Sequence, residues 1–262
     1  MANPSTLDAG QILAIDIGAT FTKSVHVDDF GLIVGVVSRQ RTLYPCTPSG
    51  LVDELTKCIV DSGCERVGVG IPVELENGRV IGPGGFSYPG GPSTLVDTEL
   101  LNLWLGFSPQ DALRESTHRD VRVVNDASLA ALGCAEGSGT ELVLTLGTGL
   151  GLGLVVDGYL RPVPDVGWEV FGDGETFDEA GGDGALKRDR TGWNSSILAM
   201  VEHFATEYQA TVVHLAGGNA RLVKLEDCQN MDFRVVTHDN EKSLQGAARL
   251  FLRPASNDGD LR

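Results

Sequence analysis

The sequence is short of basic residues and has no long apolar run. Lysine and arginine number 20 against 36 aspartates and glutamates, which gives the 262-residue chain a formal net charge of −16. Such a charge repels nucleic-acid phosphates and anionic membrane surfaces at long range. No apolar stretch approaches the roughly 18 residues that a membrane span requires. The sequence therefore disfavours nucleic acids and membranes as partners, and its acidity is typical of a solvated surface that keeps a protein soluble.

The five cysteines form no disulfide or zinc pattern. Their number is odd, and no two of them stand in a C-x-x-C pair. Zinc ribbons use such pairs, and even cysteine counts mark the disulfide frameworks of secreted proteins. Within Met1–Gln11 no basic region is followed by an apolar run, so we expect no signal peptide. The sequence thus predicts a cytoplasmic protein whose cysteines are small buried hydrophobic residues.

Apolar residues and glycines are plentiful. Hydrophobic residues make up 42% of the chain and charged residues 21%, which is typical of a globular protein with a large core. A chain of 262 residues exceeds a typical single domain, so two lobes are expected. Much of the glycine, 34 residues in all, clusters in short loops. Glycine lets the backbone come close to a ligand, so these loops are candidates for binding.

Short β-branched runs alternate with segments of helical periodicity along the chain. Strands are expected at residues 12–17, 24–27, 32–37, 66–70, 121–124, 141–146, 153–156 and 211–216. Helices are expected at residues 49–61, 95–105, 126–134, 193–208, 219–225 and 241–252. The first of these helices has Ser49 as its candidate N-cap and Gly63 just beyond its end. This order predicts an α/β protein of two similar lobes with a cleft between them.

Two segments do not follow this alternation. Residues 74–93 are rich in Gly and Pro and are expected to form a long loop with one hairpin. The acidic segment Asp173–Asp183 is expected to be a mobile, solvated loop. A calcium loop is the alternative there, although the required ligand spacing is lacking. Within the regular segments, His214 is expected to be a satisfied core residue, and Trp104 and Trp193 to be core anchors.

The first motif with chemical meaning is Asp16-Ile17-Gly18-Ala19-Thr20, which ends a strand and precedes Lys23. A tight turn of glycine and small residues exposes successive backbone N–H groups, and such a nest binds phosphate oxygens. A carboxylate on the preceding strand is able to hold Mg²⁺ through water. The alternative is an ordinary hairpin turn, because the pentapeptide alone is not specific.

Two further glycine-rich turns lie in the second half of the chain. Glycines recur at alternate positions in Thr145–Gly153, where they would let the backbone approach a phosphate. The alternative is a hairpin without a ligand. The spacing differs from G-x-G-x-x-G and a strand follows, which argues against a dinucleotide-binding fold. Gly217-Gly218 stands between a strand and a helix, where a flat ring such as adenine would lie.

Asn125-Asp126 stands where an expected buried strand meets a helix N-terminus. A carboxylate at such a junction, facing the predicted cleft, is able to accept the proton of an attacking hydroxyl while phosphate loops hold the donor in line. The alternative is that Asp126 only caps the helix, because aspartate is a common N-cap.

The order of these motifs resembles that of the ROK family, which takes its name from repressors, open reading frames and kinases. D-I-G-A-T, N-D-A, L-G-T-G-x-G and A-G-G-N follow one another, and the resemblance extends over about residues 11–252. It points most closely to the polyphosphate glucokinase branch. The resemblance implies a hexokinase/actin-like ATPase fold with two ribonuclease-H-like lobes. Residues 1–119 with a C-terminal helix at 241–262 would form the first lobe, and residues 120–240 the second.

The resemblance also implies a role for each motif. Asp126 would be the general base on a sugar hydroxyl. The residues implied to bind the substrate are Asn125, Asp165, Trp168 and Gly70. The residues implied to bind phosphate or nucleotide are Asp16, Gly18, Ala19, Thr20, Lys23, Gly147, Thr148, Gly149, Gly217 and Gly218. Asp16 would also hold Mg²⁺ through water, and ATP or polyphosphate would be the phosphoryl donor.

Three departures from the family pattern concern the sugar and the metal. The family's Glu-x-Gly-His signature is replaced by Asp165-Val166-Gly167-Trp168, and an indole cannot act as an imidazole does. The loop that carries a further sugar contact in relatives reads Gly82–Tyr88 and lacks it. The cysteine-rich zinc segment is missing, so no structural zinc is expected. The acceptor is therefore predicted to be a sugar or a sugar-like cyclitol, and not necessarily glucose.

Two functions remain open at this point: a kinase for a sugar-like alcohol, and a non-catalytic relative that binds a sugar or a nucleotide. Only about ten residues precede the first expected strand, too few for a helix-turn-helix, so a DNA-binding repressor is not expected. ATP is the expected donor, because polyphosphate needs a basic groove and the Lys and Arg residues are scattered. Relatives are often dimers, so the resemblance implies a homodimer.

Overall fold

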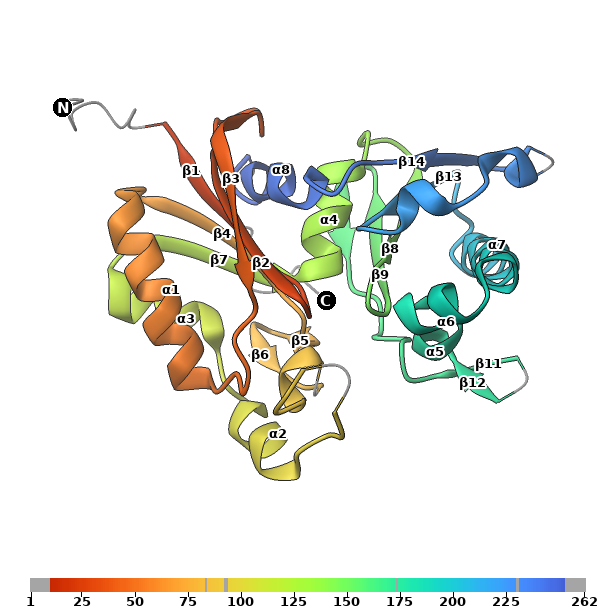
Figure 1. Cartoon of the computed structure of the whole chain (residues 1–262). Helices are drawn as coiled ribbons and strands as arrows, with labels where there is room; N and C mark the ends of the chain where they lie inside the picture. Colours follow the sequence, from red (N-terminus) through yellow and green to blue (C-terminus); the bar gives the residue numbers. More distant parts are fainter. Residues whose placement is uncertain (1–9, 83, 92–93, 173, 230, 253–262) are drawn as a thin grey trace. The chain divides into compact units, whose positions relative to one another are not determined.

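The computed structural model describes residues 10–82, 84–91, 94–172, 174–229 and 231–252 (Figure 1). By its internal contacts the chain divides into two compact units. The first comprises Met1–Leu129 and Leu244–Asp260, and the second comprises Ala130–Ser243 and Leu261–Arg262. The first change of unit therefore falls after Leu129, whereas the boundary expected from the sequence lies after residue 119.

The first unit is built on a five-stranded mixed sheet. Its strands are β1 (Ile12–Ile17), β2 (Phe21–Val27), β3 (Ile33–Arg41), β4 (Arg66–Ile71) and β7 (Asp120–Asn125). In the order β3-β2-β1-β4-β7, the first three strands pair antiparallel, and the last three run parallel. A hairpin of β5 (Leu75–Glu76) and β6 (Arg79–Val80) confirms the one expected within residues 74–93. Pro83, Pro92 and Ser93 of that loop lie outside the described residues.

The helices of this unit include one whose start was predicted wrongly. The helical elements are α1 (Pro48–Ser62), α2 (Thr98–Trp104), α3 (Pro109–Thr117) and the 3₁₀ turn η1 (Gly85–Ser87), and the start of α1 differs from the prediction. Thr47, and not Ser49, caps α1, because its backbone is extended and its hydroxyl accepts the N–H of Gly50 at 3.1 Å. Pro48 then occupies the first helical turn, where no N–H is needed. At the other end Gly63 adopts the left-handed conformation with φ 70°, as expected.

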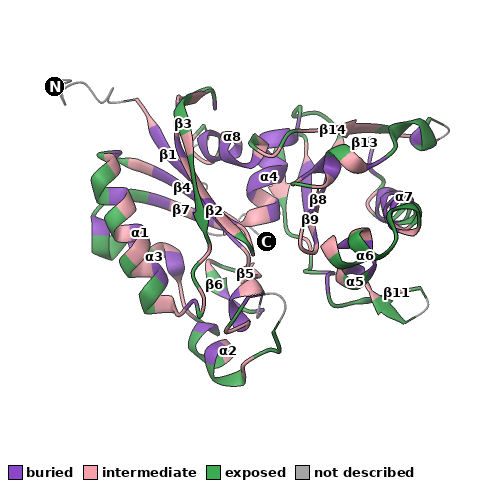
Figure 2. Ribbon diagram, in the orientation of Figure 1, coloured by how far each residue is buried: buried purple, intermediate pink, exposed green. Residues whose placement is uncertain are grey.

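The two faces of the first sheet carry separate apolar cores. Alternate side chains of a strand point to opposite faces. Leu13, Ile15 and Ile17 of β1 therefore pack in the core that includes α1, α2 and α3. Ile12 and Ala14 pack in the core that includes α8 (Lys242–Arg249). Figure 1 shows α1 and α3 on one face of this sheet, and Figure 2 shows their outer sides exposed while β1 is buried.

The second unit repeats the strand arrangement of the first. Its main strands are β8 (Thr140–Leu146), β9 (Leu150–Val156), β10 (Tyr159–Arg161), β13 (Val212–Ala216) and β14 (Arg234–Thr237). In the order β10-β9-β8-β13-β14, three antiparallel strands are again followed by two that run parallel to β8. The expected α/β class with two similar sheets is thus confirmed.

The remaining elements of the chain lie around the second sheet or at the changes of unit. The helices are α5 (Phe177–Gly181), α6 (Asp183–Arg188), α7 (Arg190–Glu207) and the 3₁₀ turns η2 (Ala220–Leu222) and η3 (Leu225–Cys228). The short strands β11 (Val170–Phe171) and β12 (Glu175–Thr176) pair with each other. The chain changes unit within α4 (Asp126–Cys134) and within α8.

The acidic segment that was expected to be a solvated loop is ordered instead, and that prediction was wrong. Its described part contains β12, α5 and the start of α6. Phe177 and Ala180 are buried in the same core cluster as α7, which provides the apolar contact that fixes the segment. Thr176 and Glu179 form a capping box at the start of α5. Asp173 lies outside the described residues.

Two tryptophans are confirmed as core anchors. Trp104 is 0% exposed and Trp193 is 1% exposed. The indole N–H of Trp104 donates to the carbonyl of Cys46 at 2.8 Å, and that of Trp193 donates to the carbonyl of Gly181 at 2.7 Å. Each ring is therefore buried without leaving its polar atom unsatisfied.

A chain of three hydrogen-bonded side chains crosses the second sheet. His214 is fully buried, as expected, and its Nε2 lies 2.9 Å from Oε2 of Glu141. Because a carboxylate only accepts, His214 donates there, and its Nδ1 shares a second hydrogen bond with Nε2 of His238 at 2.9 Å. Burial acts to raise the pKa of Glu141, but the N–H groups of Glu136 and Gly137 outweigh it and hold that pKa below its usual value.

His238 makes the stability of the protein depend on pH. Burial, with the nearby His214 and Lys242, lowers the pKa of His238 from 6.5 to about 4. Between these values the unfolded chain binds a proton here that the folded chain does not bind, so the free energy of unfolding falls as the pH drops through this window. We expect His238→Gln to flatten this dependence, because glutamine keeps a hydrogen-bonding side chain beside His214 and has no titratable group.

Urea unfolding between pH 4.5 and 7 measures the slope. His203→Gln, at an exposed position of α7, is the matched control and is expected to leave it unchanged. An unchanged slope in His238→Gln would contradict the assignment of the pH dependence to this side chain.

Candidate functional site

The parallel strands β1, β4 and β7 end together at one edge of the first sheet. Asp16 on β1 pairs in register with Gly70 on β4, and Asn125 on β7 pairs with Ile71, the residue that follows. Neighbouring strands lie about 4.8 Å apart, so the ends of β1 and β7 are separated by roughly 10 Å. Ligands of open α/β sheets bind beyond the carboxyl ends of parallel strands. The fold therefore brings Asp16, Gly70, Asn125 and Asp126 to one edge of one unit.

The first glycine loop, Gly18–Thr20, connects β1 to β2 at this same edge. The N–H of Gly18 donates to the carbonyl of Phe21 at 3.0 Å, which closes a tight turn. Just outside the loop, Nζ of Lys23 lies 3.0 Å from Oδ2 of Asp16, and both side chains are nearly buried. Lys23 is thus held against Asp16 across the two strands, and the loop offers a ligand its own backbone groups.

Gly70 allows the start of α4 to approach β4. A side chain at this position would lie 2.8 Å from Cδ2 of Leu129 and 3.2 Å from Cα of Asp126. No Cβ atom tolerates the shorter of these distances without a shift of its neighbours. The glycine predicted to bind substrate therefore sets the position of Asp126 by letting its helix pack closely.

Asn125, and not Asp126, is the cap of α4. Oδ1 of Asn125 accepts the N–H groups of Ala127 at 2.9 Å and Ser128 at 3.2 Å, which is the bonding pattern of an N-cap. Its Nδ2 donates to the carbonyl of Val73 at 3.1 Å. Asp126 is the first residue of the helix, where the helix dipole favours a negative charge. Oδ1 of Asp126 itself accepts the N–H of Ala127 at 2.9 Å. The alternative in which Asp126 has only a structural role at the helix start therefore stays open.

In the second unit, the loop Gly147–Gly149 and the Gly217-Gly218 turn lie together. Nδ2 of Asn219, which directly follows that turn, donates to the carbonyl of Gly147 at 3.2 Å. Gly217 has φ 88°, and a side chain there would lie 2.5 Å from the carbonyl oxygen of Leu146. Asn219 was part of the motif but was not singled out from the sequence. It joins the loop predicted to bind phosphate to the turn predicted to bind the nucleoside.

The glycines of these two turns differ in what surrounds them. Side chains at Gly147 and Gly218 would meet no atom within 4 Å, so their outer sides have room for a ligand. At Gly149 a side chain would lie 2.4 Å from Oδ1 of Asp178. The same oxygen accepts the N–H of Leu150 at 2.7 Å, and burial raises the pKa of Asp178.

Asp178 is a residue of this site that sequence reasoning missed. Its carboxylate supports the glycine hairpin by accepting the N–H of Leu150. Asp178 belongs to the acidic segment that was expected to be mobile. The signal that could have revealed it is the apolar pair Phe177 and Ala180 on either side, which predicts burial of the segment.

Asp165 and Trp168, the residues predicted to bind the sugar, lie on an exposed stretch of the second unit. Oδ1 of Asp165 accepts the N–H of Gly167 at 3.1 Å, and the side chain of Trp168 is 46% exposed. Trp168 is therefore not a core anchor, unlike the other two tryptophans.

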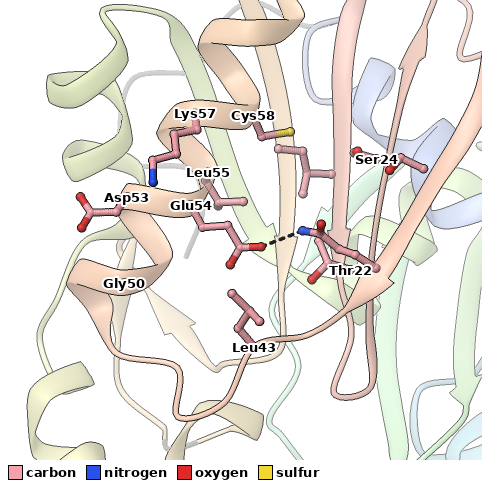
Figure 3. A pocket seen from close by; sticks show the side chains of 12 residues that line it. Thr22, Ser24, Leu43, Gly50, Asp53, Glu54, Leu55, Lys57 and Cys58 are labelled. Carbon is pink, nitrogen blue, oxygen red and sulfur yellow. Dashed lines mark hydrogen bonds between the residues drawn. The ribbon is translucent and has the colours of Figure 1, made fainter.

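A hollow of about 470 Å³ opens between α1 and the neighbouring faces of β2 and β3 (Figure 3). Hydroxyl and amide side chains of the strands line one side, and Glu54 of α1 reaches in from the other. Nε2 of Gln40 donates to Oε1 of Glu54 at 2.7 Å, and burial raises the pKa of Glu54. None of the site residues predicted from the sequence lines this hollow.

Within the described parts of the chain, no group of three or more His, Cys, Asp or Glu side chains is placed to hold a metal ion. No helix in those parts is long and apolar enough to cross a membrane. The cysteines Cys46, Cys58, Cys64, Cys134 and Cys228 are free thiols, and all except Cys58 are buried, as expected of small hydrophobic residues.

Replacement of Gly70 tests the close approach of α4. We expect Gly70→Ala to lower the free energy of unfolding by about 1–3 kcal/mol, because the methyl group overlaps Leu129 and the first turn of the helix. Gly184→Ala is the control. Gly184 is exposed in α6, and alanine there is expected to stabilise the protein by about 0.5–1 kcal/mol. Chemical denaturation measures both, and a Gly70→Ala protein as stable as the wild type would contradict the packing described.

No family model matches the chain. The sequence is 27% identical to a polyphosphate glucokinase from Mycobacterium tuberculosis over 188 residues, which cover 68% of this chain and 65% of that protein. The chain thus spans just under two thirds of the length of this relative.

The fold is also similar to that of solved structures. An inorganic polyphosphate/ATP-glucomannokinase from Arthrobacter sp. strain KM has a TM-score of 0.74 at 24% identity, with 92% of this chain and 98% of that chain covered. A ROK family glucokinase from Streptomyces griseus, solved with glucose and AMPPNP, has a TM-score of 0.65 at 18% identity, with 92% and 99% covered. By sequence the chain is therefore similar to polyphosphate glucokinases, and by fold it is similar to solved structures of ROK-family kinases.

Proposed function

We propose that this protein is a kinase that transfers a phosphoryl group to a hydroxyl of a sugar or a sugar-like compound. The observation that carries the proposal is the common edge of the first sheet, where the Gly18–Thr20 loop and Asp126 lie two strands apart. We propose the first as a backbone anion nest and the second as the carboxylate base, the two groups that phosphoryl transfer to an alcohol uses. Relatives whose names specify glucokinase activity support the same reaction.

In this mechanism Asp126 accepts the proton of the attacking hydroxyl as the oxygen bonds to phosphorus. The N–H groups of the Gly18–Thr20 loop bind the phosphoryl oxygens and stabilise the charge that develops on them. Asn125, fixed by its bonds to Val73 and to α4, holds the neighbouring part of the sugar. In the second unit, Gly147, Thr148 and Gly149 bind phosphate and Gly217 and Gly218 bind the nucleoside. Positioning supplies most of the catalysis, because a loose phosphoryl-transfer transition state needs little covalent help.

Magnesium fits this site only as a water-bridged ion. Asp16 is a single carboxylate already paired with Lys23, and the described residues provide no cluster that would hold a metal directly. Mg²⁺ keeps most of its water and binds through one or two carboxylates together with substrate phosphates. Asp16 would thus hold the ion through water, and the ion would neutralise phosphate charge on the donor.

The donor is proposed to be ATP, with polyphosphate as the alternative. The net charge of −16 opposes a long polyanion, which favours ATP. The names of the mycobacterial and Arthrobacter relatives include polyphosphate, which supports the alternative. An assay with both donors and one acceptor distinguishes ATP from polyphosphate, because a donor bound at this site prevents the other from binding.

The acceptor is proposed to be a sugar or a cyclitol, and not necessarily glucose. Asp165 and Trp168 stand in place of the family's glutamate and histidine, and both residues are exposed. An indole face stacks on the apolar face of a sugar ring, and it supplies one N–H donor where imidazole supplies two nitrogens. This change is expected to alter which ring and which hydroxyl the site accepts.

The same change favours a second candidate function, a non-catalytic relative that senses a sugar or a nucleotide. Loss of the signature residues around the sugar would leave binding without transfer. Ligand-induced melting shifts without any phosphorylated product, over a panel of sugars and cyclitols, would support it. For either function we propose a cytoplasmic homodimer, by analogy with ROK relatives.

Replacement of the proposed base tests the reaction. We expect Asp126→Asn to reduce kcat by about 100- to 10,000-fold, the range that general-base catalysis contributes. The affinity for the phosphoryl donor is expected to be unchanged, because the donor binds to the glycine loops. Steady-state kinetics with ATP and Mg²⁺, and calorimetry for donor binding, measure the two effects.

Asp61→Asn is the matched control, because Asp61 is an exposed residue of α1 away from this edge. It is expected to keep full activity. An Asp126→Asn protein that turns over at the wild-type rate would contradict the assigned base.

A further inference from the structure

The segment that follows β3 bonds to three successive carbonyl groups of the first glycine loop. The hydroxyl of Thr42 donates to the carbonyl of Gly18 at 2.7 Å. The hydroxyl of Tyr44 donates to the carbonyl of Ala19 at 2.9 Å. The backbone N–H of Thr42 donates to the carbonyl of Thr20 at 3.1 Å. We call residues 42–44 the brace of this loop.

The brace fixes the direction in which the loop offers its donors. In a planar trans peptide the C=O of one residue and the N–H of the next point in opposite directions. With the carbonyls of Gly18 and Ala19 turned toward the brace, the N–H groups of residues 19 and 20 point away from it. Successive N–H donors on one side of a short loop form an anion-binding nest.

We infer that Thr42 and Tyr44 are positioning residues, which orient the Gly18–Thr20 loop for the phosphoryl donor without touching the donor themselves. The inference rests on the proposed function for its reaction, and on the hydrogen bonds alone for its geometry. Neither residue was among the site residues found from the sequence, because they follow the motif by more than twenty positions.

The hydroxyl of Thr42 is itself held in place. Oγ1 of Thr22 lies 3.3 Å from Oγ1 of Thr42, and Thr22 is buried. Because the proton of Thr42 is used on the carbonyl of Gly18, Thr22 donates and Thr42 accepts in this pair. The side chain of Thr42 is therefore bonded on both sides and has little freedom to rotate away from the loop.

Tyr44 is kept as a hydrogen-bond donor to the loop. Burial raises its pKa, and the charge of Asp126 adds to this. The hydroxyl thus stays protonated and remains a donor to Ala19. A side chain at Gly91 would lie 3.3 Å from the ring, so that glycine allows the main chain to pack against it.

Variants that lack one hydroxyl group at Thr42 or at Tyr44 test the brace. Thr42→Val keeps the shape and removes the donated hydrogen bond, and Tyr44→Phe does the same at Ala19. We expect each to raise KM for the phosphoryl donor by roughly two- to tenfold, the range of a single hydrogen bond. KM for the acceptor is expected to stay at the wild-type value, since the loop binds phosphate and not the sugar.

Thr42→Ser keeps the hydroxyl and is expected to restore the donor KM to within about twofold of the wild type. Thr56→Val is the matched control. Its hydroxyl bonds to Ser116 at 2.7 Å on α1 and α3, away from the loop, so the donor KM should not change. Thermal melting of each variant separates loss of folding from loss of positioning, and the rescue by serine does so independently.

Direct binding keeps the test separate from the proposed reaction. Calorimetry with inorganic triphosphate as the probe measures the nest whether or not the protein turns over. Weaker triphosphate binding in Thr42→Val and Tyr44→Phe, with wild-type binding in Thr42→Ser and Thr56→Val, supports the brace even if no product forms. Triphosphate affinity equal to the wild type in folded Thr42→Val and Tyr44→Phe overturns it. A wild-type protein that binds triphosphate and transfers nothing overturns the proposed function alone.

Discussion

The parallel register of β1, β4 and β7 decides where the proposed site residues of the first unit lie. Because the three strands end together, Asp16, Gly70 and Asn125 occupy neighbouring positions at one edge, and Asp126 follows at the start of α4. Asp126 lies at this edge only if α4 begins directly against β4. Gly70 makes that possible, since a side chain there would overlap Leu129. The glycine acts through packing, and the position of the carboxylate follows from it.

The glycine loop of the second unit is also held by side chains outside the loop, but through a different set of contacts. Its sheet has the same order of three antiparallel and two parallel strands as the first. Its glycine loop is supported by side chains: Asp178 binds the N–H of Leu150, and Asn219 binds the carbonyl of Gly147. The first loop is supported by Thr42 and Tyr44 through its carbonyls. In both units, polar side chains outside the glycine motif give a flexible loop one conformation, which offsets the entropy that glycine carries.

Much of this could be predicted from the sequence, because local patterns carry it. β1 and α4 were predicted with the bounds that the structure has, since a β-branched run and a helix after Asn-Asp are strong local signals. α3 was missed because its residues are mostly polar, with Leu113 its main buried apolar side chain. The acidic segment was predicted wrongly because its many charged residues indicated a solvated loop, although the same segment contains the buried Phe177. Thr42, Tyr44 and Asp178 could not be found at all, because their partners are distant in sequence and only the fold brings them together.

The central claim is that this edge performs phosphoryl transfer to an alcohol. Phosphorus NMR of the wild-type protein with Mg²⁺, a panel of sugars and cyclitols, and either ATP or polyphosphate tests it most directly. We expect a new phosphate monoester signal with at least one acceptor, together with loss of the donor signal. Folded protein that consumes neither donor, or that releases only inorganic phosphate with every acceptor, would contradict it.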